Sequence, residues 1–208
     1  MPTQERRIGA DPLIIRSVEF MGGMAQPGGW RPPMSLPEVA FLGRSNVGKS
    51  ALLNRLVQRR AIARVSRTPG RTQEINFFCI NDLFVLADLP GYGYARVSKE
   101  RQTTWRPLIE GYLGNTATLR GAVQLLDVRH DPTDDDLAML GFLAALETPA
   151  LIVVTKVDKL ARSAAADRVR ALAGSLSLDD SQVIAFSAVT GEGRDELAAA
   201  VATLVESR

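Results

Sequence analysis

From residue 38 onward, short apolar runs alternate along the chain with longer segments of helical pattern. The apolar runs predict strands at 38–42, 74–80, 83–87, 121–128, 150–154 and 182–186, and the other segments predict helices at 51–58, 99–113, 134–147, 162–173 and 194–206. Such an alternation is typical of a parallel α/β sheet. We therefore expect a doubly wound α/β fold with a mostly parallel, six-stranded sheet.

Three local signals refine this pattern. Asn81 and Asp82 form so short a link that the strands on either side should pair as an antiparallel hairpin, which would give the sheet one antiparallel strand. Pro107 lies inside the helix expected at 99–113 and should kink it or divide it into two pieces. Thr133 precedes three aspartates, and we interpret this run as a helix cap with acids in the first turn rather than as a metal site.

The first 37 residues differ from the rest. The run 13–20 has the composition of a strand, whereas residues 21–37 are rich in glycine and proline and are expected to form a linker. The sequence therefore predicts an N-terminal extension and linker over residues 1–37, with an extra strand near 13–20, followed by a single domain over residues 38–208.

The composition is that of an ordinary globular protein, with 46% hydrophobic and 23% charged residues in a chain of 208. No apolar run approaches the roughly 18 to 20 residues that span a bilayer, and no secretory segment follows the N-terminus. We therefore expect a cytoplasmic protein without a membrane partner. The single cysteine, Cys79, cannot form an internal disulfide and should be a small buried hydrophobic residue.

The net charge of +2 conceals an uneven distribution, because one segment holds six arginines and no acidic residue: Arg55, Arg59, Arg60, Arg64, Arg67 and Arg71. An arginine run is most often a solvated face. This run directly follows the phosphate-loop segment described next, which favours a polyanionic partner such as RNA.

One segment fits the phosphate-binding pattern G-x-x-x-x-G-K-[ST] without a mismatch: Gly43, Arg44, Ser45, Asn46, Val47, Gly48, Lys49 and Ser50. It lies between an expected strand and an expected helix, which is the context that the motif requires. The backbone N–H groups and the helix dipole would bind phosphate oxygens, Lys49 would reach the β- and γ-phosphates, and the Ser50 hydroxyl would bind Mg²⁺. A glycine-containing turn that binds nothing is the less favoured reading.

A second segment, Asp88, Leu89, Pro90 and Gly91, closes the strand expected at 83–87. The Asp88 carboxylate can hold Mg²⁺ through a water molecule, and Gly91 can present its backbone N–H to a γ-phosphate. Taken alone, D-x-P-G is only a turn sequence.

Two further segments favour guanine. Thr155, Lys156, Val157 and Asp158 resemble the guanine-reading element N-K-x-D, in which the aspartate accepts hydrogen bonds from guanine N1–H and N2–H₂ while the lysine stem lies over the base. Thr155 departs from the commoner asparagine, which changes one supporting hydrogen bond. Phe186, Ser187 and Ala188 end and follow the next expected strand, where a backbone N–H would meet guanine O6.

These four segments together resemble the G1, G3, G4 and G5 boxes of a small translation-factor-type GTPase over about residues 38–207. More closely, the residues at 43–50, 69–73, 88–95 and 155–158 resemble the EngB (YihA/YsxC) family of bacterial ribosome-assembly GTPases, in which threonine in the fourth box is usual. The resemblance implies a P-loop GTPase G domain that binds GTP and GDP with Mg²⁺.

The resemblance also implies a G2 element formed by Gly70, Arg71, Thr72 and Gln73. Thr68 competes for the same role, but Thr72 lies immediately before the second strand and would complete the Mg²⁺ shell when GTP is bound. Loss of the γ-phosphate would then release this loop as a switch.

Candidate catalytic residues are Lys49, Thr72 and Gly91. Tyr92 stands where many GTPases keep a water-positioning glutamine, so slow intrinsic hydrolysis is expected. In related GTPases the position of Asn46 helps to hold K⁺ beside the phosphates, which makes Asn46 a candidate K⁺ ligand.

The EngB resemblance implies a nucleotide-dependent switch in assembly of the large (50S) ribosomal subunit, needed for normal growth, cell division and septation. Its partners would be the subunit precursor and rRNA, contacted by the arginine segment, with no DNA partner and a monomeric state. Two alternatives stay open. One is a P-loop phosphotransferase (kinase), and the other is an RNA-binding module that uses GTP only as a structural ligand.

Overall fold

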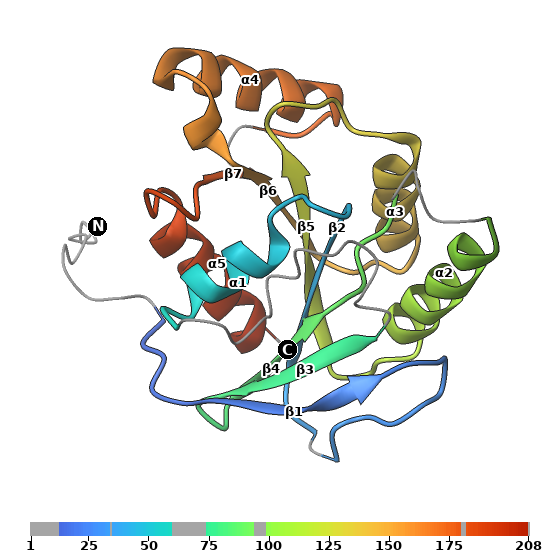
Figure 1. The fold of residues 1–208 in the computed structure, drawn as a ribbon. Helices are drawn as coiled ribbons and strands as arrows, with labels where there is room; N and C mark the ends of the chain where they lie inside the picture. The colour runs from blue at the N-terminus through green and yellow to red at the C-terminus, as the bar shows by residue number, and fades with distance from the viewer. Residues whose placement is uncertain (1–12, 34, 60–73, 94–98, 180–181, 208) are drawn as a thin grey trace, which may run out of the picture.

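The computed structural model describes residues 13–33, 35–59, 74–93, 99–179 and 182–207. Its centre is a sheet of seven strands in the order β1-β3-β4-β2-β5-β6-β7 (Figure 1). The strands are β1 (Val18–Met24), β2 (Glu38–Gly43), β3 (Ile75–Ile80), β4 (Phe84–Asp88), β5 (Leu119–Asp127), β6 (Ala150–Thr155) and β7 (Val183–Phe186). β3 pairs antiparallel with both of its neighbours, and the other pairs are parallel. Among the described strands, β3 alone therefore runs against the rest, as expected.

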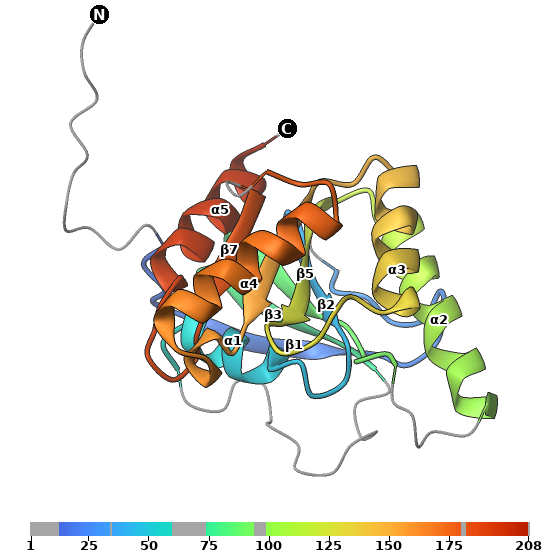
Figure 2. The same ribbon diagram turned by 90° about the horizontal axis from the view of Figure 1, so that it is seen from above.

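Helices cover both faces of this sheet (Figure 2). They are α1 (Lys49–Leu56), α2 (Lys99–Gly114), α3 (Asp134–Ala145), α4 (Arg162–Ser175) and α5 (Arg194–Glu206), with a 3₁₀ turn η1 (Val157–Lys159). Side chains alternate in direction along a strand. In β2, accordingly, Val39 and Phe41 pack with α1 and α5, whereas Ala40 and Leu42 pack with α2 and α3. Burial on both faces explains why the central strands are mostly apolar.

The sheet has seven strands and not the six expected for residues 38–208, because the extra strand expected near 13–20 joins its edge as β1. It pairs with β3 from Val18 opposite Ile80 to Met24 opposite Ile75, so it begins later than the run 13–20 and extends into the segment that we expected to be a linker. The misleading residue is Gly22. The register shifts between Phe20 and Gly22, and a Cβ atom on Gly22 would lie 2.6 Å from the Trp30 ring. Glycine here makes room for an aromatic ring within a strand.

Other local expectations are confirmed or corrected by particular contacts. Pro107 lies inside α2, which runs unbroken from Lys99 to Gly114 and is not divided. Thr133 caps α3, and the Asp136 carboxylate accepts hydrogen bonds from the Thr133 N–H at 2.9 Å and hydroxyl at 2.7 Å. No group of three potential metal-binding side chains occurs within the described ranges. Cys79 is buried, and burial raises the pKa of its thiol.

No helix in the part of the chain that the structure describes has the length and apolar character to cross a membrane.

The segment before β2 is fixed to the core by a polar cluster. Glu38 is only 4% exposed and accepts hydrogen bonds from Tyr112 at 2.9 Å, Thr118 at 2.6 Å and Arg31 at 2.6 Å. The Arg31 guanidinium also lies 5.2 Å from the centre of the Tyr112 ring and donates a hydrogen bond to Thr116. A buried carboxylate needs such partners, because an unpaired one is costly to remove from water.

Replacement of Arg31 by alanine is expected to lower the free energy of unfolding by about 1–3 kcal/mol, because Glu38 keeps its burial and loses its cation. Guanidinium denaturation measures this change. Arg106→Ala is the matched control, since its pair with Glu110 is largely exposed and should contribute less than about 0.5 kcal/mol. Equal losses of unfolding free energy in the two variants would show that the Arg31 contact contributes no more than an exposed ion pair.

Candidate functional site

Four of the segments singled out by their chemistry meet at one edge of the sheet. They follow the carboxyl ends of β2, β4, β6 and β7, which run parallel to one another and end on the same side (Figure 1). Open α/β sheets bind ligands at this edge. The site therefore lies where the fold class places it.

The loop between β2 and α1 has the backbone geometry of an anion-binding loop. Asn46 has φ 65°, and Gly48, the residue before α1, has φ 105°. Gly48 has no capping side chain, so the first N–H groups of α1 are not satisfied by a local cap. This arrangement suits phosphate oxygens, which accept such hydrogen bonds and are stabilised by the helix dipole.

Lys49 and Asp88 form an ion pair between the start of α1 and the end of β4. Their side chains are 10% and 7% exposed. The expected phosphate-binding cation and the expected Mg²⁺-binding carboxylate are thus brought into direct contact. Ser50 lies beside them in the first turn of α1.

Backbone hydrogen bonds join the loop after β4 to β2 and to the loop that follows β2. Ser45 N–H donates to the Tyr92 carbonyl at 2.8 Å, and Leu89 N–H donates to the Phe41 carbonyl at 3.0 Å. Gly91 lies so close to the loop after β2 that a Cβ atom added to it would be 3.1 Å from Ser45 Cα. Because that neighbour is backbone, a larger residue at position 91 would displace one of the two loops.

The Tyr92 side chain anchors this junction in the core. It is 1% exposed, donates a hydrogen bond to Asp136 at 2.9 Å, accepts one from Gln124 and stacks on Trp105 with ring centres 5.6 Å apart. Burial and the neighbouring Asp136 raise the pKa of Tyr92, so its hydroxyl stays protonated. Sequence reasoning identified Tyr92 only as the substitute for a glutamine and missed this role, because Gln124 and Asp136 are distant in sequence.

Thr155 ends β6 and contacts the same loop from the other side. Its hydroxyl lies 2.6 Å from the Val47 carbonyl and 3.0 Å from the Leu126 carbonyl, and the residue is 2% exposed. The threonine therefore makes a buried hydrogen bond to the phosphate loop.

Asp158 is held in place by Ser187. The Ser187 hydroxyl donates to Asp158 Oδ1 at 2.7 Å and accepts hydrogen bonds from the N–H groups of Val189 and Thr190. The hydrogen bond from Ser187 lowers the pKa of Asp158, and Lys159 adds to this effect. Asp158 is thus an ionised hydrogen-bond acceptor with a fixed orientation. Ala188 directly follows Ser187, the residue that orients it.

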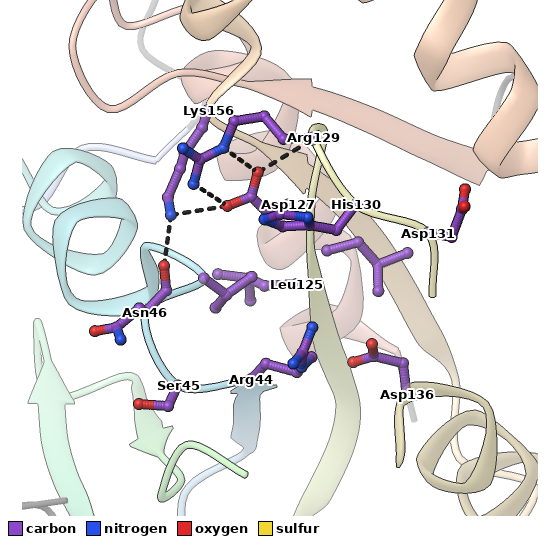
Figure 3. Close-up of a pocket in the computed structure, with 12 residues that line it drawn as sticks. Arg44, Ser45, Asn46, Leu125, Asp127, Arg129, His130, Asp131, Asp136 and Lys156 are labelled. Atoms are coloured by element: carbon purple, nitrogen blue, oxygen red, sulfur yellow. Dashed lines mark hydrogen bonds and ion pairs between the residues drawn. The ribbon is translucent and has the colours of Figure 1, made fainter. Parts of the chain in front are cut away.

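Lys156 and a residue that the motif analysis missed, Asp127, lie at a pocket of about 190 Å³ beside the loop (Figure 3). Lys156 donates to the Asn46 carbonyl and, at 2.8 Å, to Asp127 Oδ2. Figure 3 shows Ser45 and Asn46 pointing to one side of the loop and Arg44 to the other, toward Asp136. Asp127 could have been noticed because it ends β5 at the same edge of the sheet.

Not every expected site residue can contribute its side chain. Four of them are buried in the hydrophobic core and can offer only backbone groups: Val47, Leu89, Val157 and Phe186. Gly43 is also enclosed, since a Cβ atom there would lie 3.0 Å from Leu125 and Val47. Pro90 lies between Leu89 and Gly91 in the joined loops.

Part of the expected site lies outside the described residues, namely Gly70, Arg71, Thr72 and Gln73, together with Arg60, Arg64 and Arg67. The other two arginines of that segment are exposed at the end of α1. Arg55 donates to the Thr190 carbonyl at 3.3 Å, and Arg59 donates to the Arg16 carbonyl at 2.7 Å.

Comparisons with known proteins agree with this geometry. Residues 38–156 match the family described as "50S ribosome-binding GTPase". The chain is 60% identical over 193 residues to the "Probable GTP-binding protein EngB" of Gemmatimonas aurantiaca, covering 93% of this chain and 95% of that protein. It is 44% identical over 193 residues to the protein of the same name from Citrifermentans bemidjiense, covering 93% and 90%.

Solved structures with the same fold include the "Crystal structure of a probable GTP-binding protein engB", with a TM-score of 0.68 and 24% identity over 82% of this chain and 99% of that one. Era from Aquifex aeolicus, bound to GDP.AlF4-, has a TM-score of 0.63 and 22% identity over 83% of this chain and 57% of that one. At these identities the likeness establishes the fold alone.

Ser187→Ala is expected to raise the pKa of Asp158 toward the value of about 3.9 of a free aspartate. Because the pKa of Asp158 is lower in the folded than in the unfolded protein, its ionisation stabilises the fold at pH values above the unfolded pKa, and this contribution is lost as the pH falls through the folded pKa. The Ser187 variant should therefore lack the whole of this contribution to stability at pH 7, and the difference from the parent protein that it causes should vanish in acid. Carbon NMR titration of the Asp158 carboxyl measures the shift.

Ser175→Ala removes a comparable hydroxyl, which donates to the Leu172 carbonyl within α4, and serves as the control. An unchanged pKa of Asp158 in the Ser187 variant would contradict the assigned hydrogen bond.

Proposed function

The chain belongs to the EngB family of GTP-binding proteins, and we propose that it acts as a nucleotide-dependent switch in assembly of the large ribosomal subunit. As a member of this family it is a GTPase built on a P-loop G domain, and it binds GTP and GDP.

The observation that carries the proposal is the support of Asp158 by Ser187, at 2.7 Å. An ionised carboxylate held in one direction can accept hydrogen bonds from both N1–H and N2–H₂ of guanine, and adenine has no such pair of donors. A P-loop kinase that binds ATP would have no use for this aspartate, because adenine lacks the two donors that it would accept from. Lys156 and the backbone N–H of Ala188 complete the proposed base site.

For Mg²⁺, the chain offers the hard oxygen donors that this ion prefers, namely the Ser50 hydroxyl and, through water, the Asp88 carboxylate. We assign Thr72 as a further ligand in the GTP state. Mg²⁺ would neutralise charge on the β- and γ-phosphate oxygens. Because Mg²⁺ usually keeps several waters and binds substrate phosphates, phosphates and water would supply the other ligands. Lys49 is the cation that would meet the same phosphates.

Hydrolysis should be slow without help. Tyr92 follows Gly91, and its side chain is committed to the core through Asp136, Gln124 and Trp105. It therefore cannot position a water molecule beside the γ-phosphate. A K⁺ ion bound by Asn46, whose side chain is exposed, is our candidate for the missing electrostatic stabilisation.

GTP turnover is accordingly expected to be several times faster in KCl than in NaCl, and Asn46→Ala should remove the difference. Steady-state phosphate release at equal ionic strength measures both effects. Asn115→Ala, a surface amide at the end of α2, is the matched control and should keep the K⁺ response. Equal turnover of the parent protein in the two salts would rule out the K⁺ role.

Two observations support the large ribosomal subunit and its rRNA as the partner. The matched family is described as a 50S ribosome-binding GTPase. The described part of the arginine segment, Arg55 and Arg59, is exposed at and just beyond the end of α1, the helix that begins at the phosphate loop. We further propose that the protein acts in the cytoplasm as a monomer and that its loss disturbs growth, division and septation.

Co-sedimentation with 50S particles is expected to be stronger in GTP than in GDP or without nucleotide. Neutralising Arg64 and Arg67 to glutamine should weaken binding and reduce its dependence on salt, because fewer phosphate contacts release fewer counterions. Arg162→Gln, an exposed position on α4, is the charge-matched control. Equal association in all three nucleotide states would contradict the switch.

A further inference from the structure

Asp127 is a partly buried carboxylate at the nucleotide edge that belongs to none of the recognised sequence motifs. It is the last residue of β5, and its side chain is 10% exposed. Its neighbour across the sheet in β6 is Thr155, and the two strands are joined beyond this pair by a hydrogen bond from Val128 N–H to the Thr155 carbonyl at 3.1 Å. The backbone of Asp127 is therefore fixed by the sheet, next to the guanine-reading segment 155–158.

Two cations share this carboxylate (Figure 3). Arg129 donates to Oδ1 from its backbone N–H at 3.1 Å and from Nε at 2.9 Å, and to Oδ2 from its terminal nitrogen at 2.7 Å. Lys156 donates to Oδ2 at 2.8 Å. Burial raises the pKa of Asp127, but these hydrogen bonds more than offset it and hold the pKa well below the usual range. The carboxylate is therefore charged at neutral pH.

The lysine that Asp127 holds has two other constraints. Its backbone is left-handed, with φ 61°, and its ammonium also donates to the Asn46 carbonyl of the phosphate loop. Its stem passes the same loop, since a Cβ atom on Gly48 would lie 3.5 Å from Lys156 Cε. A long flexible side chain keeps one such path only when its charged end is fixed.

We propose that Asp127 is a positioning residue of the nucleotide site, which acts by fixing the Lys156 ammonium on the Asn46 carbonyl. The lysine then joins the guanine-reading segment to the phosphate loop, and its stem is held along the loop where the nucleotide will lie. Arg129 completes the neutralisation of the carboxylate from the exposed rim, where its side chain is 43% exposed. This role rests on the proposed guanine site.

Asp127→Asn is expected to accelerate GDP and GTP dissociation by about tenfold each, because the lysine loses a charged hydrogen-bond partner that orients it for both nucleotides. The KM for GTP should rise while kcat at saturating GTP stays unchanged, since the interaction is equal in the ground state and the transition state. Stopped-flow dissociation of fluorescent nucleotides and steady-state hydrolysis measure the two effects.

A double-mutant cycle separates positioning from general damage to the fold. If Asp127 acts through Lys156, adding Asp127→Asn to Lys156→Met should change dissociation no further. Additive effects in the cycle would overturn the proposal. Asp131→Asn, in the loop that follows β5, is the matched control, because Asp131 is 84% exposed and pairs with Arg168 away from the lysine. A thermal melt of each variant confirms folding.

The outcomes also distinguish this proposal from the guanine site on which it rests. If Asp127→Asn behaves like the Asp131 control while the parent protein still prefers GDP to ADP, the positioning role is wrong and the guanine site stands. If the parent protein shows no such preference, the guanine site itself is wrong.

Discussion

Hydrogen bonds from the end of β6 to the outward-facing carbonyls of the phosphate loop are the constraint on which the site depends. A loop that turns its N–H groups inward toward phosphate must turn carbonyls outward, and buried carbonyls need donors. The Thr155 hydroxyl donates to the Val47 carbonyl, and the Lys156 ammonium donates to the Asn46 carbonyl. Because Asp158 follows on the same segment, the element that reads the base and the loop that binds the phosphates are parts of one hydrogen-bonded unit.

The opposite side of the loop is fixed by backbone instead of side chains. The bond from Ser45 N–H to the Tyr92 carbonyl and the close crossing of Gly91 hold the two loops together, and the Tyr92 ring anchors both in the core. Under the proposed function this anchoring slows catalysis, since the residue that could have positioned water is used to build the site. Under the proposed function, slow hydrolysis and the need for a cation or a partner follow from the packing of one tyrosine.

Much of this could be predicted from sequence, because the deciding signals are local. Strand and helix patterns, the loop at 43–50 and the cap at Thr133 each need only neighbouring residues. The errors and omissions all involve contacts between distant segments. From sequence, Gly22 looks like a residue that ends a strand, and only the structure shows that the Trp30 ring packs over it. Tyr92 looks only like the replacement of a glutamine, and the structure shows its hydrogen bonds with Asp136 and Gln124. Asp127 matches no motif, and only its position at the end of β5 brings it to Lys156.

Under the proposed function, Asp158, supported by Ser187 and joined to the phosphate loop through its own segment, reads guanine. Calorimetric titration of the parent protein with GDP, IDP and ADP in the presence of Mg²⁺ tests this directly, because inosine lacks the N2 amino group and adenine lacks both donors. We expect tight binding of GDP, binding of IDP weaker by about tenfold or more, and no measurable binding of ADP. Equal affinity for GDP and ADP would contradict it.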